Sequence, residues 1–227
     1  MTTARTTSSP TGTGATDGGE RVADDTDVLR RLRTGTAAEH RAVENALDLL
    51  SPQLTRARLA DVLARMHGFW RAAEAGLDAW ARDHPADAGR VQWSDRHRTG
   101  LFAADLAALG AVPAGVPELP DVPDTDAALG RLYVLEGSSL GGVFIDRHLA
   151  TLPQLAGIGR LSSFSPYGER TGAMWHAFRT VTRARIAAGG DAGRLVDAAR
   201  ATFGALAAWC GAPAAPLHTP ARTEVPA

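Results

Sequence analysis

The chain has 227 residues, enough for one domain with a full hydrophobic core, and its 44% hydrophobic and 22% charged residues are ordinary for a globular protein. A formal net charge of -1 argues against a nucleic-acid-binding protein, and no apolar run approaches the length of a membrane span, so we expect neither partner. The only cysteine, Cys210, excludes an internal disulfide and any multi-cysteine metal site, so we expect a cytoplasmic protein.

The two ends of the chain differ in composition from the middle. Residues 1–26 are rich in Thr, Gly and Ser, contain no aromatic residue and lack the apolar region of a secretory signal. The end of the chain is rich in proline and alanine. We therefore predict a disordered N-terminal tail at 1–26, a helical domain at 27–210 and a flexible C-terminal tail at 211–227.

The first periodic segment of the domain predicts one amphipathic helix. Residues three or four apart on one face of this segment are Leu29, Leu32, Thr36, His40, Val43 and Leu47. Asp25 or Thr26 can cap its start, and Ser51-Pro52 ends it.

The helical period continues along the rest of the domain. Thr55 can cap a second helix that stops before Pro85, and a shorter helix is predicted at 94–109. A proline-rich loop follows, after which Asp124, Thr125 or Asp126 caps a helix running to about Leu152.

A turn-rich connection precedes two last helices, at about 170–189 and 191–210. Alternating strand patterns are missing. The sequence thus predicts an all-α fold in a single domain of about six helices.

His40 is the histidine that stands out, because it occupies a core position on the apolar stripe of its helix. A lone histidine on such a face is more often a satisfied core residue than a metal ligand. Glu44, one turn later, could accept from one imidazole nitrogen and leave the other free as a ligand. Alternatively, Glu44 is a solvated charge or pairs with Arg41.

The other histidines have more ordinary interpretations. His67 and His176 have apolar neighbours, which favours partly buried structural roles, and we expect solvated side chains at His84, His97, His148 and His218. The chain has no Glu-x-x-His pair, so a ferritin-like di-iron site is not supported. Cys210 is predicted to be an inert buried thiol.

The stretch Tyr133–Gly142, YVLEGSSLGG, places three glycines inside a predicted helix, where each costs about 1 kcal/mol relative to alanine. Gly137, Ser138 and Gly141 are predicted along one side, where missing side chains would let something flat approach the backbone. Gly141-Gly142 also favours a kink. Close helix–helix packing is the alternative explanation.

Taken together, TAAEHRAVE (Thr36, His40, Glu44) and the later EGSSLGG resemble the heme oxygenase family, over about 27–210. The resemblance is to the bacterial, biliverdin-producing branch. It implies a helical bundle with heme between a proximal helix and a kinked distal helix.

The resemblance also implies roles for individual residues. His40 matches the proximal histidine that binds the heme iron, with Thr36 and Glu44 in the same motif, and Glu44 matches its orienting carboxylate. Gly137, Ser138, Gly141 and Gly142 match the distal helix. Basic positions that face the heme propionates are matched by Arg33, Arg179 and Arg183.

The implied reaction uses heme as cofactor and substrate, with dioxygen as co-substrate. It opens the ring at a meso carbon and yields biliverdin, carbon monoxide and ferrous iron. No Gly-x-Gly-x-x-Gly fingerprint is present, so an external ferredoxin or reductase would supply electrons, and a bacteriophytochrome could receive the biliverdin.

One residue departs from the pattern, because Ser138 stands where some relatives carry an aspartate that holds a water network. A non-catalytic heme carrier of the same fold is therefore one alternative. A di-iron oxidase on this scaffold would need more inward carboxylates and histidines, and a thiaminase-type hydrolase would need a mid-chain cysteine.

Overall fold

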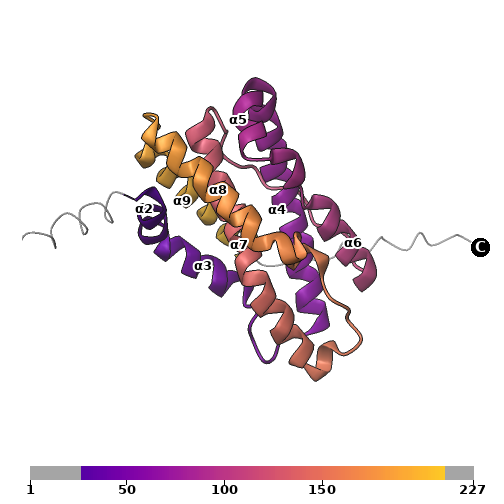
Figure 1. Ribbon diagram of the computed structural model, residues 1–227. Helices are drawn as coiled ribbons and strands as arrows, with labels where there is room; N and C mark the ends of the chain where they lie inside the picture. The colour runs from indigo at the N-terminus through magenta and orange to yellow at the C-terminus, as the bar shows by residue number, and fades with distance from the viewer. Residues whose placement is uncertain (1–26, 213–227) are drawn as a thin grey trace, which may run out of the picture.

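A computed structural model describes residues 27–212, and the predicted tails at 1–26 and 213–227 lie outside them. These described residues form α-helices and short 3-10 helices joined by loops, with no strand among them, which confirms the all-α prediction (Figure 1). The α-helices are α2 (Val28–Gly35), α3 (Ala37–Leu47), α4 (Arg56–Asp83), α5 (Pro85–Arg90), α6 (Thr99–Leu109), α7 (Thr125–Thr151), α8 (Thr171–Ala187) and α9 (Ala192–Gly211). The 3-10 helices are η1 (Trp93–Asp95), η2 (Pro153–Leu155), η3 (Ser162–Phe164) and η4 (Gly168–Arg170).

Several predicted boundaries are confirmed by hydrogen-bonded caps. The Thr55 hydroxyl accepts from the Arg58 amide at the start of α4, and Asp124 accepts from the Ala127 amide at the start of α7. The last helix, predicted at about 191–210, is present as α9 (Ala192–Gly211).

The prediction of one helix from residue 29 to 47 is wrong. The helix breaks at Thr36, whose φ of -112° and ψ of 6° separate α2 from α3. The cap of α2 is Asp27, which accepts from the Leu29 amide, whereas the predicted caps Asp25 and Thr26 lie outside the described residues. The short helix α5 was not predicted either, because a proline at position 85 indicates a helix end, although proline is also well suited to a first helical turn.

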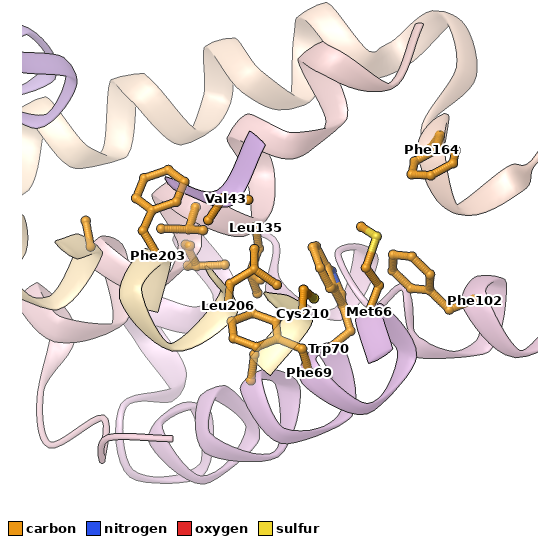
Figure 2. Packing of buried hydrophobic residues seen from close by; sticks show 14 of the residues in the cluster. Val43, Met66, Phe69, Trp70, Phe102, Leu135, Phe164, Phe203, Leu206 and Cys210 are labelled. Carbon is orange, nitrogen blue, oxygen red and sulfur yellow. The ribbon is translucent and has the colours of Figure 1, made fainter. Parts of the chain in front are cut away.

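Helix α9 has packing partners in four helices, α3, α7, α2 and α4. Helix α6 packs against α4, on the right of the view in Figure 1. The contact between α7 and α9 is close, because a Cβ at Gly130 would lie 2.3 Å from the Leu195 carbonyl oxygen. The core extends along these interfaces, and Figure 2 shows part of it, including Val43, Phe203 and Leu206.

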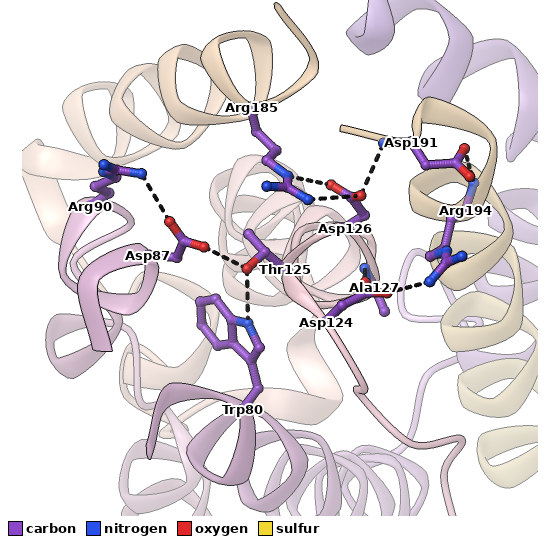
Figure 3. Close-up of polar contacts among 10 residues, drawn as sticks. All are labelled: Trp80, Asp87, Arg90, Asp124, Thr125, Asp126, Ala127, Arg185, Asp191 and Arg194. Carbon is purple, nitrogen blue, oxygen red and sulfur yellow. Dashed lines mark hydrogen bonds and ion pairs between the residues drawn. The ribbon is translucent and has the colours of Figure 1, made fainter. Parts of the chain in front are cut away.

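The N-terminus of α7 is held by a polar network that reaches four other helices (Figure 3). The Thr125 hydroxyl donates to Asp87 of α5 and accepts from the Trp80 indole of α4. Asp126 pairs with Arg185 of α8 and accepts from the Asp191 amide that precedes α9. This network fixes where α7 begins, and hence the register of the glycine-rich stretch further along it.

None of the helices in residues 27–212 is long and apolar enough to cross a membrane.

Candidate functional site

Three helices bring aromatic rings together beside His40. The His40 imidazole of α3 meets the Phe203 ring of α9 edge-on, with ring centroids 5.4 Å apart. Tyr133 of α7 approaches the same Phe203 ring at 6.4 Å and the Trp175 ring of α8 at 6.0 Å. His40 is therefore oriented by packing, although it is not buried.

The expectation that His40 occupies a core position is wrong, because 54% of its side chain is exposed. The other members of the predicted stripe do face the core, since Leu32, Thr36 and Val43 are 0%, 2% and 7% exposed, so His40 is an exposed position within it. The Glu44 carboxylate lies 3.5 Å from His40 Nδ1, on the side predicted. His40 Nε2 makes no hydrogen bond within the described residues, so it is free to act as a ligand.

Helix α7 presents an open apolar face built around two of its glycines. A Cβ at Gly137 or Gly141 would have no atom within 4 Å, so both positions face open space. Leu140 and Phe144, within one turn on the same face, are 39% and 66% exposed. We call Gly137, Leu140, Gly141 and Phe144 the open face of α7.

Contacts at both ends of this open face connect α7 to the α3 region. At one end, Tyr133 and His40 share the Phe203 ring. At the other end, His148 Nε2 lies 3.1 Å from the Ser51 carbonyl oxygen in the turn after α3. The open face thus lies between two contacts with the α3 region, and α3 carries the exposed side chains of His40 and Glu44.

Ser138 and Gly142 do not belong to the open face, which corrects their predicted positions. The Ser138 hydroxyl donates to the Leu135 carbonyl and accepts from Arg98 Nη1, both at 2.7 Å. A Cβ at Gly142 would lie 1.7 Å from the Phe164 carbonyl oxygen, so this glycine permits close packing against η3. Each is one position from a glycine of the open face and is therefore rotated by about 100° away from it.

Helix α7 also runs without interruption through both glycine positions, as one α-helix from Thr125 to Thr151. The glycines do not break it. A bend of α7 at Gly141-Gly142 therefore stays a prediction.

A buried polar network supports the back of α7, and the sequence did not predict it. The Glu136 carboxylate pairs with Arg96 and accepts from the Tyr167 hydroxyl at 2.7 Å. Arg98, less than 2% exposed, donates to the carbonyls of Leu135 and Ser163 and lies over the Trp70 ring. Arg96 and Arg98 lie in a polar stretch of the sequence, SDRHRTG, which gives no local signal that they are buried.

The glycine-rich stretch also contains Gly-x-Ser-x-Gly, at Gly137–Gly141, which is the pattern of a hydrolase nucleophile. Its central Ser139 is buried within α7, and its hydroxyl donates to the Glu136 carbonyl at 2.7 Å. A nucleophile elbow needs a strand-to-helix turn that exposes the serine, so this match has no catalytic meaning.

Cys210 is confirmed as a buried thiol, and burial raises its pKa to about 12. His67 is buried as predicted, whereas His176 is exposed, so its predicted structural burial is wrong. Among residues 27–212, no three His, Cys, Asp or Glu side chains lie close enough together to hold a metal ion.

The predicted propionate ligands differ in their availability. Arg183 pairs with Asp27 at 2.7 Å, so it is already engaged at the start of α2. Arg179, one turn earlier on α8, has a buried Nε without a hydrogen-bond partner in the described residues. Arg33 on α2 is exposed.

Thr36 has an internal role rather than the predicted one at the cofactor. It is 2% exposed, and its hydroxyl donates to the Leu32 carbonyl at 2.7 Å. The Tyr133 hydroxyl lies beside it, where Thr36 and Arg33 oppose the effect of burial, which raises the pKa of Tyr133. Thr36 therefore joins α2, α3 and α7.

These residues fit a planar, acidic, iron-containing ligand. A free imidazole nitrogen, an apolar face without Cβ atoms at Gly137 and Gly141, and an unpartnered guanidinium nitrogen at Arg179 are the groups such a ligand needs. A separate cavity of about 460 Å³ lies further along α7, lined by Val143, Asp146 and Arg160 among others, and does not include His40.

Comparisons with known proteins identify the family of this fold. A protein described as heme oxygenase, from Xanthomonas campestris pv. campestris (strain 8004), is 30% identical over 145 residues, covering 63% of this chain and 83% of that protein. A solved heme oxygenase from Neisseria meningitidis has the same fold, with a TM-score of 0.63 at 22% identity over 82% of this chain and 90% of that chain. A sequence model of the family described as heme oxygenase matches residues 26–211. Since this match spans all the described helices, the chain belongs to the heme oxygenase family of enzymes.

Proposed function

We propose that the protein binds heme through His40 and cleaves it to biliverdin, carbon monoxide and ferrous iron, using dioxygen and electrons from an external donor. One observation carries this proposal: a half-exposed histidine with a free Nε2 lies across from the open face of α7, and both are positioned by the same Phe203 ring. Family membership supports the reaction class.

When bound, heme supplies the iron at which dioxygen is activated and the ring that is opened. His40 Nε2 is the iron ligand in this proposal, and Glu44 near Nδ1 orients the imidazole and raises its basicity. Gly137 and Gly141 let the ring approach the backbone of α7, which limits the space for dioxygen. The solved relative from Neisseria meningitidis was crystallised in NO-bound and CO-bound forms, which supports a site for a diatomic ligand.

The three predicted arginines differ in how readily they could bind the heme propionates. Arg179, with its unpartnered Nε, and exposed Arg33 are the proposed partners of the two carboxylates. Arg183 can take part only by exchanging its contact with Asp27.

Proton supply to the open face would come from ordered water. The Ser138 hydroxyl is turned back toward Arg98 and Leu135, so it cannot reach the open face in this arrangement. This orientation is also the observation that favours a second candidate, a heme carrier that binds through His40 without degrading heme.

Three further proposals name the electron donor, the receiver of biliverdin and the location of the protein. An external ferredoxin or reductase would supply electrons, a bacteriophytochrome is a proposed receiver of biliverdin, and we propose a cytoplasmic location.

Hemin titration of the wild type, His40→Ala and His97→Ala separates these functions. His97 is a suitable control because it is exposed and its contacts, with Asp78 and Trp93, include none of the proposed heme-binding residues. We expect the Soret band of the hemin complex to differ from that of the wild type only in His40→Ala. On addition of a reductant under air, the wild type should lose its Soret band while biliverdin and carbon monoxide appear.

Each other outcome has a definite meaning. A Soret band that persists under reductant and air, with no biliverdin, identifies a carrier and contradicts the enzyme. An unchanged spectrum in His40→Ala contradicts His40 as the iron ligand.

A further inference from the structure

A second cavity lies where the loop before α7 passes α4. A cavity of about 480 Å³ is lined there by small and apolar residues of both segments, including Ala72, Gly76, Pro117 and Leu119. The charged residues of its wall are Arg131 of α7 and Asp121 of the loop. None of these residues belongs to the proposed heme site.

Arg131 is an unusual residue for such a wall because it is buried without an ion pair. It is 4% exposed, and its Nη2 donates to the Pro120 carbonyl. Its Nε has no hydrogen-bond partner, and its Nη1 makes none within the described residues. Asp121 acts on the charge of Arg131, but Asp121 is exposed and forms no ion pair with Arg131 among the described residues.

The surrounding backbone makes room for this guanidinium. A Cβ at Gly76 would lie 2.4 Å from Arg131 Nη1, so the missing side chain leaves the space that the guanidinium occupies beside α4. Burial lowers the pKa of Arg131 to about 10, with Asp121 opposing, so the group stays positively charged at neutral pH. A buried charge without a counterion is strongly destabilising, and an anion from outside would relieve this cost.

The chemistry of the wall selects the kind of anion. The cavity offers one buried positive charge and one exposed negative charge, which disfavours a dianion such as phosphate. Its alanines, prolines and leucine suit an apolar body beside the charged group. We propose that this cavity binds a small organic monocarboxylate, with its carboxylate on Arg131 and its apolar part against α4 and the loop.

The competing explanation is that Arg131 only anchors the loop through the Pro120 carbonyl. Titration of the ¹⁵N-labelled full chain with benzoate, followed through the arginine Nε–H signals, distinguishes the two. We expect a saturable shift of the Arg131 signal with benzoate and none with benzamide, which has the same shape without the charge.

Variants test the assignment. Arg131→Met should weaken benzoate binding at least tenfold, whereas Arg82→Met, which removes an exposed arginine from α4, should bind as the wild type does. If Arg131→Met fails to fold, Asp121→Asn still tests the site, because removing the exposed negative charge should tighten binding by about two- to fivefold.

Three results would each overturn the proposal. They are equal shifts with benzamide, benzoate binding by Arg131→Met at wild-type strength, and no effect of Asp121→Asn. The absence of a saturable benzoate shift leaves Arg131 as a loop anchor alone.

Discussion

The imidazole of His40 stands edge-on to the ring of Phe203, with centroids 5.4 Å apart and ring planes at 76°. The same phenylalanine meets Tyr133 edge-on at 83°. Helix α9 therefore sets the position of α3 relative to α7, and with it the distance between His40 and the open face. A change at Phe203 should alter the site without touching any proposed ligand.

Replacement of Phe203 by alanine should both destabilise the fold and weaken heme binding. Phe203 is 6% exposed, so its loss should lower the free energy of unfolding by about 3 kcal/mol, at the lower end for a buried phenylalanine. Hemin affinity should fall about tenfold because His40 loses its orienting ring. Leu77→Ala on α4 is the control: it should be similarly destabilised yet bind hemin normally when folded. Equal hemin affinity in both variants would contradict the role of Phe203.

Gly137 and Gly142 should respond oppositely to alanine. Gly137→Ala places its methyl group in open space, and it should stabilise the helix by up to about 1 kcal/mol. Gly142→Ala places its methyl group against the Phe164 backbone, and it should cost about 3 kcal/mol or more. Urea unfolding of the two variants measures the difference. Similar stabilities would show that α7 and η3 are not packed as described.

A larger side chain on the open face should block binding rather than folding. Gly141→Leu has room in the free protein, so its unfolding midpoint should stay near that of the wild type. Its hemin titration should show little or no Soret change, because leucine occupies the space proposed for the ring. Normal heme binding and degradation by this variant would show that the open face is not the heme site.

Most of the helical fold could be predicted from the sequence, because local signals mark its boundaries. Thr55 and Asp124 act as caps where the pattern predicts them. The break at Thr36 was missed because its signal lies in another helix: a Cβ at Gly35 would lie 2.9 Å from Val196 of α9. Close packing of this kind cannot be recognised in α2 and α3 alone.

The residues of the candidate site could likewise be predicted only where the signal is local. His40, Glu44 and Gly141 follow local spacing and lie where they can face one ligand. Ser138 and Gly142 were misplaced, because a shift of one position on a helix turns a residue by about 100° and the partners that fix this rotation are distant in sequence. Arg98, which holds Ser138, lies 40 residues away from it.

The buried pair of Glu136 and Arg96 should be essential to stability. Glu136 is 2% exposed, and Glu136→Gln would leave the Arg96 charge uncompensated, lowering the free energy of unfolding by about 3–5 kcal/mol. Tyr167→Phe removes one hydrogen bond to the same carboxylate and should cost about 1–2 kcal/mol. Chemical denaturation measures both. Arg160→Ala, which breaks the exposed pair with Asp146, should change stability by well under 1 kcal/mol. A loss in Glu136→Gln no larger than in Arg160→Ala would contradict this account.

Asp126 should make the fold sensitive to acid. Burial acts to raise the pKa of its carboxyl, but the Arg185 guanidinium and the Asp191 amide outweigh burial, so the pKa lies below its ordinary value. A carboxyl whose pKa is lower in the folded state contributes stability that is complete above the unfolded pKa of about 4. This contribution is lost as the pH falls through the folded pKa. The wild type should therefore lose stability below about pH 4.

Asp126→Asn tests this dependence, because asparagine cannot titrate. At pH 7 the variant should be about 1–3 kcal/mol less stable than the wild type, since the hydrogen bonds to a charged group are weakened. The difference should shrink as the pH falls below about 4, because the carboxyl of Asp126 takes up a proton in the unfolded wild type before it does so in the folded state. Asp83→Asn, at the exposed end of α4, should follow the wild type at every pH. A constant difference between Asp126→Asn and the wild type from pH 7 to pH 3 would mean that the carboxylate charge does not hold the start of α7.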